Sequence, residues 1–266
     1  MPPQIRDLLT SLNQLTVASV SQVPFVVPWE DPRGPAFFFE QATAERYTQL
    51  PILRDRSIRR IVETAALANV TEWDSAPDGR RIEVEDLVAR DAPLFSVLHR
   101  LEDRPLLLSL GPNGVDGVLT IYDLNMPAAH MFALGLTLIV ENEIASAISL
   151  SLENQRAVES HVTSILTRKN KQVQQWEKAV AGGEQVEILH YLTFFEKSRC
   201  LTDRAVLLLA SAAGVTPEDL KLQLREVRQL RNQIAHYSVF ELNDYRTVVP
   251  RMRRLYRLAT KLAASA

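Results

Sequence analysis

The chain has 266 residues, of which 46% are hydrophobic and 23% charged, and its formal net charge is −2. This is an ordinary composition for a folded protein with room for two domains. The single cysteine, Cys200, excludes an internal disulfide framework and a zinc site built from several cysteines, and it fits a reducing compartment. The five histidines show no metal-ligand spacing, so we predict no metal site.

We expect a cytoplasmic protein with no membrane partner. The N-terminal residues Met1–Asp7 lack the charged region and apolar run of a secretory leader. The longest apolar stretch, Met131–Val140, is shorter than the roughly 20 residues that a membrane-spanning helix needs.

Residues 1–150 have the pattern of a mixed α/β domain. Short apolar runs rich in β-branched residues or leucine predict strands, and longer amphipathic stretches between them predict helices. The predicted strands lie at Val23–Val27, Leu50–Leu53, Leu106–Leu108 and Gly117–Ile121, and the predicted helices at Gln41–Thr48, Ile58–Asn69 and Pro93–Arg100.

This part also contains a weak internal repeat of strand, helix, two strands and helix. The second copy is the clearer one, in residues 84–94 and in the Gly-Val-Leu-Thr-Ile-Tyr-Asp-Leu of residues 117–124. The repeat resembles a tandem pair of CBS domains. The resemblance implies an adenine nucleotide as a regulatory ligand, bound through Thr120 and Asp123 in the Thr-x-x-Asp pattern at the start of the last helix.

The same two residues have a second interpretation. Threonine at an N-cap with an acid three residues later is an ordinary helix start. In the first copy the equivalent positions are Glu63 and Ala66, so the pattern is lost there. Two alternatives therefore stay open, a single nucleotide site and a purely structural pair of domains.

From about residue 143 the chain reads as helix almost throughout, and we set the second domain at 151–266. The helix boundaries are inferred from long stretches without proline, from glycines that end a helix, and from Thr216-Pro217, which begins one. Helices are expected over Glu141–Gly183, Val186–Phe195, Asp203–Ala213, Thr216 to about His236, and about Tyr245–Ala263. The predicted fold class is therefore α+β, a mixed module followed by an all-α bundle.

The last third carries the sequence Arg231-Asn232-Gln233-Ile234-Ala235-His236-Tyr237. Histidine can move a proton near neutral pH, and arginine can stabilise the negative charge of a phosphoryl transition state. Asn232 is a hydrogen-bonding neighbour that can orient either group. These residue types suit cleavage of RNA without a metal ion.

This motif resembles that of the HEPN family of helical bundles, whose ribonucleases carry Arg-Asn-x-x-x-His. The resemblance implies a metal-independent endoribonuclease with catalytic Arg231, Asn232 and His236, no required cofactor, a homodimer, and an antidote protein of the toxin–antitoxin kind. The alternative is structural, with a solvated Arg231 and with His236 at a helix end.

Residues 221–261 contain ten basic and three acidic residues, whereas the chain as a whole is slightly acidic. Such a patch is typical of a polyanion-binding surface, and we expect Arg228, Arg251, Arg254 and Arg257 to contact RNA. Helical arginines on a solvated face give the same pattern. A second function thus stays open, a non-catalytic nucleotide-sensing regulator that dimerises through its helical domain.

Overall fold

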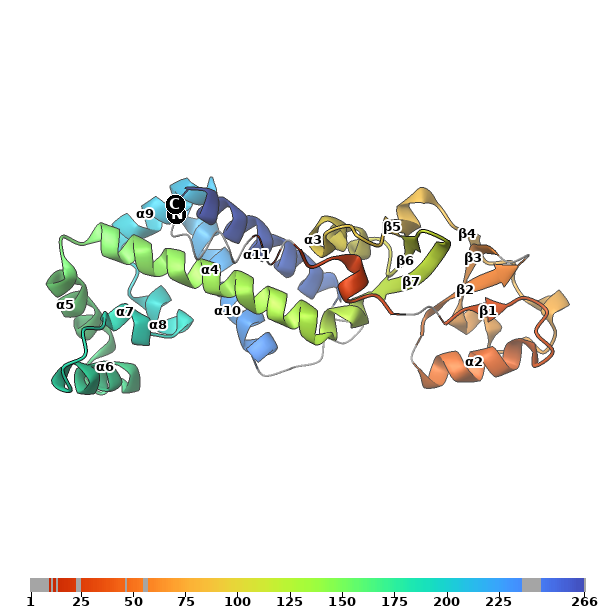
Figure 1. Ribbon diagram of the computed structural model, residues 1–266, viewed down its shortest axis with the longest axis horizontal. Helices are drawn as coiled ribbons and strands as arrows, with labels where there is room; N and C mark the ends of the chain where they lie inside the picture. Colours follow the sequence, from red (N-terminus) through yellow and green to blue (C-terminus); the bar gives the residue numbers. More distant parts are fainter. Residues whose placement is uncertain are drawn as a thin grey trace. The chain divides into compact units, whose positions relative to one another are not determined.

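The computed structural model describes residues 10, 12, 14–22, 25–45, 47–54, 57–235 and 245–265, which divide into two compact units (Figure 1). Leu15–Met126 make up most of the mixed unit, and residues from Pro127 onward make up most of the helical unit. The sequence placed the boundary at residue 150. The long helix over residues 127–151 lies on the helical side of the division.

The first copy of the repeat forms a four-stranded sheet in the order β1-β2-β3-β4, covered by one helix. β1 runs parallel to β2, whereas β2 with β3 and β3 with β4 are antiparallel. Phe38 and Ala42 of the helix pack on Val27, Leu50 and Val62 of the sheet. The elements are β1 (Val27–Pro28), α2 (Gly34–Ala44), β2 (Gln49–Arg54), β3 (Ser57–Glu63) and β4 (Arg80–Arg81).

Two helix predictions in this copy are wrong. Ile58–Asn69 was expected to be helical, but β3 occupies its first part, with Pro51 opposite Ile61 in the hairpin of β2 and β3. Pairing with a neighbouring strand decides the conformation of such a β-branched run, whatever its local periodicity. The helix expected at Gln41–Thr48 lies earlier, with Pro35 in its first turn.

The second copy repeats the order of the first. Its three strands are arranged β5-β6-β7, with β5 parallel to β6 and β6 antiparallel to β7. The elements are β5 (Leu87–Ala89), α3 (Leu94–Val97), a 3-10 helix (Leu98–Glu102), β6 (Leu106–Gly111), β7 (Gly114–Thr120) and a second 3-10 helix (Ile121–Asn125). The succession of strand, helix and two strands is therefore present in both copies, although β3 of the first copy was expected to be helical.

The two sheets share a small core within the mixed unit. Ile61 of β3 packs with Leu106, Leu108 and Val118 of the second copy, and all four side chains are buried. Arg80, directly opposite Ile61 on β4, lies on this same face of the first sheet. The opposite face of the first sheet packs on α2.

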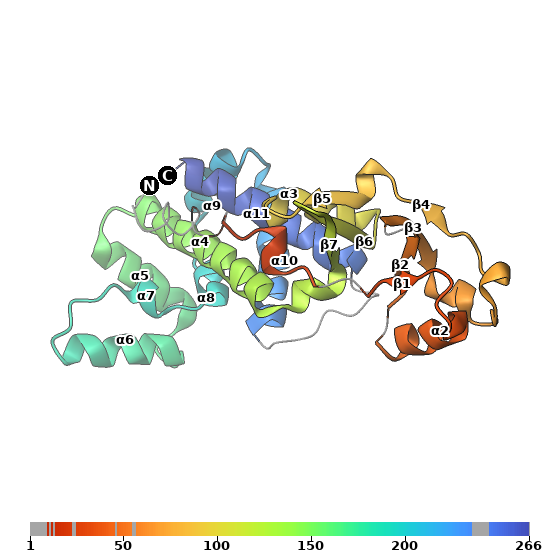
Figure 2. The same ribbon diagram turned by 45° about the vertical axis from the view of Figure 1, so that its right-hand side comes forward.

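The helical unit is organised around its longest helix, α4, which contacts α8, α9 and α10 (Figures 1 and 2). Its buried side chains include Leu136, Ile139, Val140 and Ile144. The described helices are α4 (Pro127–Ser151), α5 (Gln155–Leu166), α6 (Lys171–Ala181), α7 (Ile188–Tyr191), α8 (Phe194–Arg199), α9 (Asp203–Ala213), α10 (Pro217–Ala235) and α11 (Tyr245–Ser265).

The predicted positions of α9, α10 and α11 are confirmed. The prediction of a single helix over Glu141–Gly183 is wrong. Asn154 and Asn170 cap new helices with their side-chain oxygens, and Thr167 adopts a φ of 61° between them. The segment Val186–Phe195 is likewise divided, because the Thr193 hydroxyl caps α8.

Helix α4 is the one helix among the described residues that is long and apolar enough to cross a bilayer by length and composition, with a mean hydropathy of 1.5 over 18 residues. Of that window, 61% is buried inside the fold. The helix also carries Glu141, whose carboxylate accepts a hydrogen bond from buried Lys197 at 2.8 Å. These features fit the central helix of the bundle.

Candidate functional site

A cleft of about 520 Å³ lies on the first sheet of the mixed unit. The β-ladder places Ile52 opposite Arg60, and Arg60 opposite Arg81, so the three side chains share one face of the sheet. Trp29 follows β1 and donates its backbone N–H to the Leu53 carbonyl at 2.9 Å. The cleft is lined by Trp29, Ile52, Arg54, Arg60, Asp78, Arg81 and Ile82.

Three arginines and one carboxylate set the charge of this cleft, which we call the arginine cleft. The Arg54 guanidinium lies 5.4 Å from the centre of the Trp29 ring. Arg60 forms an ion pair of 3.1 Å with Asp78 and donates to the Gly79 carbonyl at 3.0 Å. Like charges directly opposite each other on neighbouring strands repel, so the pair of Arg60 and Arg81 favours an anion between them. The cleft therefore combines positive charge with a planar aromatic wall.

Gly79 makes the turn beside the cleft possible. Its φ is +68°, and a Cβ atom built on it would lie 2.5 Å from the Ile61 carbonyl oxygen. Only glycine adopts this conformation at low cost while the backbone passes so close to β3. The turn brings the Gly79 carbonyl and the Asp78 carboxylate within reach of Arg60.

Sequence reasoning missed the arginine cleft. The signal was the two basic pairs Arg59-Arg60 and Arg80-Arg81, which belong to β3 and β4. The region of Arg60 was predicted to be a helix. The strand register that places Arg60 opposite Arg81 could therefore not be inferred from the sequence. Trp29 and Arg54 come from two further elements, and nothing in their local sequence links them.

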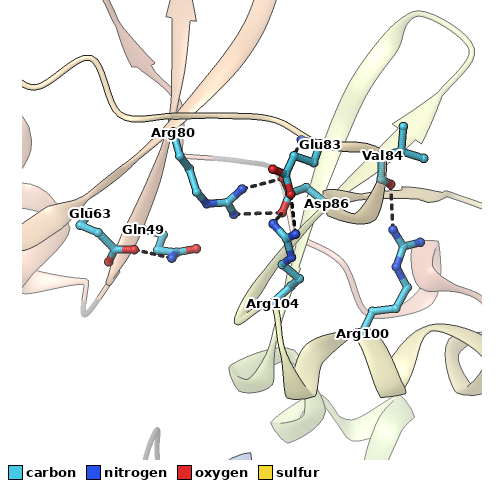
Figure 3. A network of polar contacts seen from close by, with 8 residues as sticks. All are labelled: Gln49, Glu63, Arg80, Glu83, Val84, Asp86, Arg100 and Arg104. Atoms are coloured by element: carbon cyan, nitrogen blue, oxygen red, sulfur yellow. Dashed lines mark hydrogen bonds and ion pairs between the residues drawn. The ribbon is translucent and has the colours of Figure 1, made fainter.

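A second polar group lies deeper in the mixed unit (Figure 3). The Asp86 carboxylate is fully buried and accepts hydrogen bonds from Arg80 at 2.6 and 2.9 Å and from Arg104 at 3.2 Å. The Glu83 backbone N–H donates to the same carboxylate at 2.8 Å. Burial alone would raise the pKa of Asp86, but the two arginines and the N–H outweigh it, and the pKa is lowered. This network joins β4 of the first sheet to the second copy.

Thr120 and Asp123, the residues expected to bind a nucleotide, form a capping box. The Thr120 backbone N–H donates to the Asp123 carboxylate at 2.6 Å, and the Thr120 hydroxyl donates to the same oxygen at 3.0 Å. Asp123 is only 2% exposed. The ordinary helix start that the sequence left open is therefore present, and the carboxylate is turned into the fold.

Burial raises the pKa of Asp123 to about 6, against the lowering effect of the hydrogen bonds from Thr120 and Gln22. The folded state thus binds a proton more tightly than the unfolded chain. The contribution of Asp123 to the free energy of unfolding is therefore greatest below about pH 4, and it falls as the pH rises to about 6. At neutral pH the ionised Asp123 costs stability, on the order of 2–3 kcal/mol.

The substitution Asp123→Asn should therefore stabilise the protein at pH 7 by about 1–3 kcal/mol, because the amide oxygen can still accept the Thr120 N–H without a buried charge. Urea unfolding from pH 4 to pH 8 measures this. The wild type should lose stability relative to the variant across the interval from pH 4 to 6. Parallel pH profiles for the two proteins would contradict the assignment.

Of the Arg-Asn-x-x-x-His motif, residues 231–235 form the last part of α10. Arg231 is half-buried and Asn232 is exposed. His236 lies outside the described residues, so the distance between Arg231 and His236 stays open. Arg228 and Asn232, four residues apart, share a face of the helix.

The other expected RNA contacts lie on α11. Arg257 is exposed and Arg251 is half-buried. Arg254 forms a bidentate ion pair with Glu226 of α10, at 2.6 and 2.9 Å. Part of the predicted basic patch is therefore neutralised inside the helical unit.

Comparisons with known proteins give only distant similarities. No family model matches the chain, and no curated protein matches it. Among solved structures, a CBS-domain hemolysin-like protein of Oenococcus oeni PSU is 14% identical, over 45% of this chain and 94% of that one, with a TM-score of 0.34. The CBS domain of a bacterial CNNM/CorC family Mg²⁺ transporter, in complex with ATP, is 15% identical over 46% and 94%, also with a TM-score of 0.34.

The CBS domains of a transcriptional regulator from Streptococcus pneumoniae are 17% identical, over 41% of this chain and 96% of that one, with a TM-score of 0.34. Sequence identities and TM-scores this low carry no argument by themselves. The likeness of the mixed unit to a CBS pair therefore rests on the repeated strand order described above.

Proposed function

We propose that the protein is a nucleotide-sensing regulator whose ligand binds in the arginine cleft of the mixed unit. The observation that carries this proposal is the gathering of Arg54, Arg60 and Arg81 around a cleft walled by Trp29. A guanidinium group can bind two oxygens of a phosphate at once through parallel hydrogen bonds. The face of an indole ring is a surface on which a purine base can stack. A volume of about 520 Å³ lies in the usual range for small-molecule sites.

The proposed base is adenine, as the CBS resemblance implies. Thr120 and Asp123 are the rival location for the nucleotide, but their polar atoms already bond to one another. Binding there requires the capping box to open, whereas in the arginine cleft a base needs only the Arg54 side chain to move off the Trp29 ring. For this reason we place the ligand in the cleft.

A thermal-shift panel of AMP, ADP, ATP and inorganic pyrophosphate tests the proposal. A ligand present at 100 times its dissociation constant stabilises the folded state by about 2.7 kcal/mol, which raises the melting temperature by several degrees. We expect the nucleotides to shift the melting temperature more than pyrophosphate does, because only they can stack on Trp29. No shift with any nucleotide at millimolar concentration would reject the proposal.

For the helical unit the proposed activity is metal-independent cleavage of RNA, with the nucleotide as a regulatory ligand rather than a cofactor. His236 would take the proton of the 2′-hydroxyl and return one to the leaving 5′-oxygen, while Arg231 stabilises the phosphorane and Asn232 orients one of them. The motif holds no carboxylate that would bind Mg²⁺. The exposed Asn232 and the basic face of α10 support this proposal.

A homodimer is part of the same proposal. On an ideal helix, positions 231 and 236 lie about 140° apart, so a single continuous helix does not bring both side chains to one phosphate. Two chains that each contribute one residue would do so. An antidote protein that covers the site is the corresponding expected partner.

A further inference from the structure

A hollow of about 210 Å³ between α8 and α10 gathers cations around one aromatic ring. Lys221, Arg225 and Arg228 project from one face of α10, and Arg199 comes from the end of α8. The remaining lining residues are Phe195, Ser198, Leu201 and Leu224, so no acid lines the hollow. We call it the α8–α10 hollow.

No carboxylate among the described residues neutralises the cations of this hollow. In the part of the chain that the structure describes, Arg199, Lys221, Arg225 and Arg228 form no ion pair, in contrast to Arg254 with its bidentate partner Glu226. Four adjacent positive charges repel one another, and this is a cost to the free protein that an anion removes. The hollow is therefore suited to a ligand with several negative charges.

The aromatic ring narrows the choice of ligand. Phe195 is 46% exposed, and the guanidiniums of Arg228 and Arg199 lie 5.0 and 5.8 Å from its centre. A phenyl ring and guanidinium planes at a basic groove are the surfaces on which unpaired nucleic acid bases stack. An acidic peptide would use the charges but gain little from the ring.

We propose that the α8–α10 hollow binds single-stranded RNA, with one base on Phe195 or its flanking guanidiniums and phosphates on Lys221 and Arg225. The site deepens the proposed ribonuclease function on which it rests. Lys221, Arg225, Arg228 and Asn232 follow one another along a single face of α10 over about 16 Å. A strand held in the hollow is thereby led along α10 to the catalytic motif.

Fluorescence anisotropy with a labelled 12-nucleotide oligouridylate tests the site. Binding is measured with the His236→Ala chain in EDTA, so that the RNA stays intact. Adding Phe195→Ala should weaken binding roughly 5- to 100-fold, the scale for the loss of one stacking ring, and Phe195→Tyr should retain it. Arg225→Gln should weaken binding and lower the slope of log K against log salt by about 0.7. Arg156→Gln, an exposed arginine of α5 outside the hollow, is the matched control.

Three outcomes overturn the inference: no binding of the oligonucleotide, equal binding by the Phe195→Ala and Phe195→Tyr chains, or equally tight binding of polyglutamate. The last would identify an acidic protein as the partner. Cleavage by the wild-type chain is assayed separately. If RNA binds through Phe195 but is never cleaved, the ribonuclease proposal fails and this site stands. If the wild-type chain cleaves RNA while the added Phe195→Ala change leaves binding unaltered, the ribonuclease proposal stands and the α8–α10 hollow is not the RNA site.

Discussion

Replacing Asp86 with alanine should lower the free energy of unfolding of the mixed unit by about 2–4 kcal/mol at pH 7. Asp86 is fully buried and balances Arg80 and Arg104 in one network (Figure 3). Its removal leaves the Arg80 guanidinium and the Glu83 N–H without their acceptor, whereas Arg104 keeps its ion pair with the Glu83 carboxylate. The side chains of Arg80 and Arg104 are 35% and 27% exposed, so water can hydrate them, and we place the loss below that of a wholly buried pair.

The matched control is Asp78→Ala, which breaks an aspartate–arginine pair whose carboxylate side chain is 63% exposed. It should cost about 1 kcal/mol or less in the absence of ligand. Because the pKa of folded Asp86 is lowered, its contribution is present above the unfolded pKa of about 4 and is lost as the pH falls further. Urea unfolding that shows equal losses for the two variants at pH 7 would contradict the role of Asp86.

His236→Ala should slow RNA cleavage by roughly 10²–10⁴-fold, the usual effect of losing a general acid or base. The assay is incubation of the purified protein with total RNA in excess EDTA, and the expected product carries a cyclic phosphate. His190→Ala removes an exposed histidine of α7 and should leave the rate unchanged.

A composite site adds a second readout to this prediction. Arg231→Ala and His236→Ala chains, each inactive alone, should regain part of the activity when mixed, if the two residues act across a dimer. Cleavage by the His236→Ala chain at the wild-type rate would remove His236 from the mechanism. A strictly monomeric protein in light scattering would exclude the composite site.

Much of the fold could be predicted where a local signal decides the structure. Helix α9 is capped by Gly214, whose φ of +63° suits glycine, and α10 begins at Pro217. Both boundaries could therefore be predicted from the sequence. The apolar runs of β2, β6 and β7 identified the strands and the repeat. The asparagine caps were overlooked, and for this reason the last part of α4, from Glu141, was taken as one helix with α5 and α6.

The candidate site was less predictable because register and burial create it. Arg60 and Arg81 are 21 positions apart in sequence, and only the β3–β4 pairing sets them opposite each other. Asp86 is one acid among several in its segment, and nothing local indicates that two arginines surround it. Thr120 and Asp123 show the converse case, since the pattern was visible in sequence but the structure gives it a capping role.

Isothermal titration with ATP measures nucleotide binding in the arginine cleft without an intermediate readout. Wild-type protein should bind, Arg81→Gln should weaken binding about 10-fold or more, and Asp123→Asn should bind like the wild type. Arg90→Gln removes an exposed arginine that pairs with Asp116 elsewhere in the mixed unit and should have no effect. Loss of binding in Asp123→Asn with full binding in Arg81→Gln would place the nucleotide at the capping box and exclude the arginine cleft as its site.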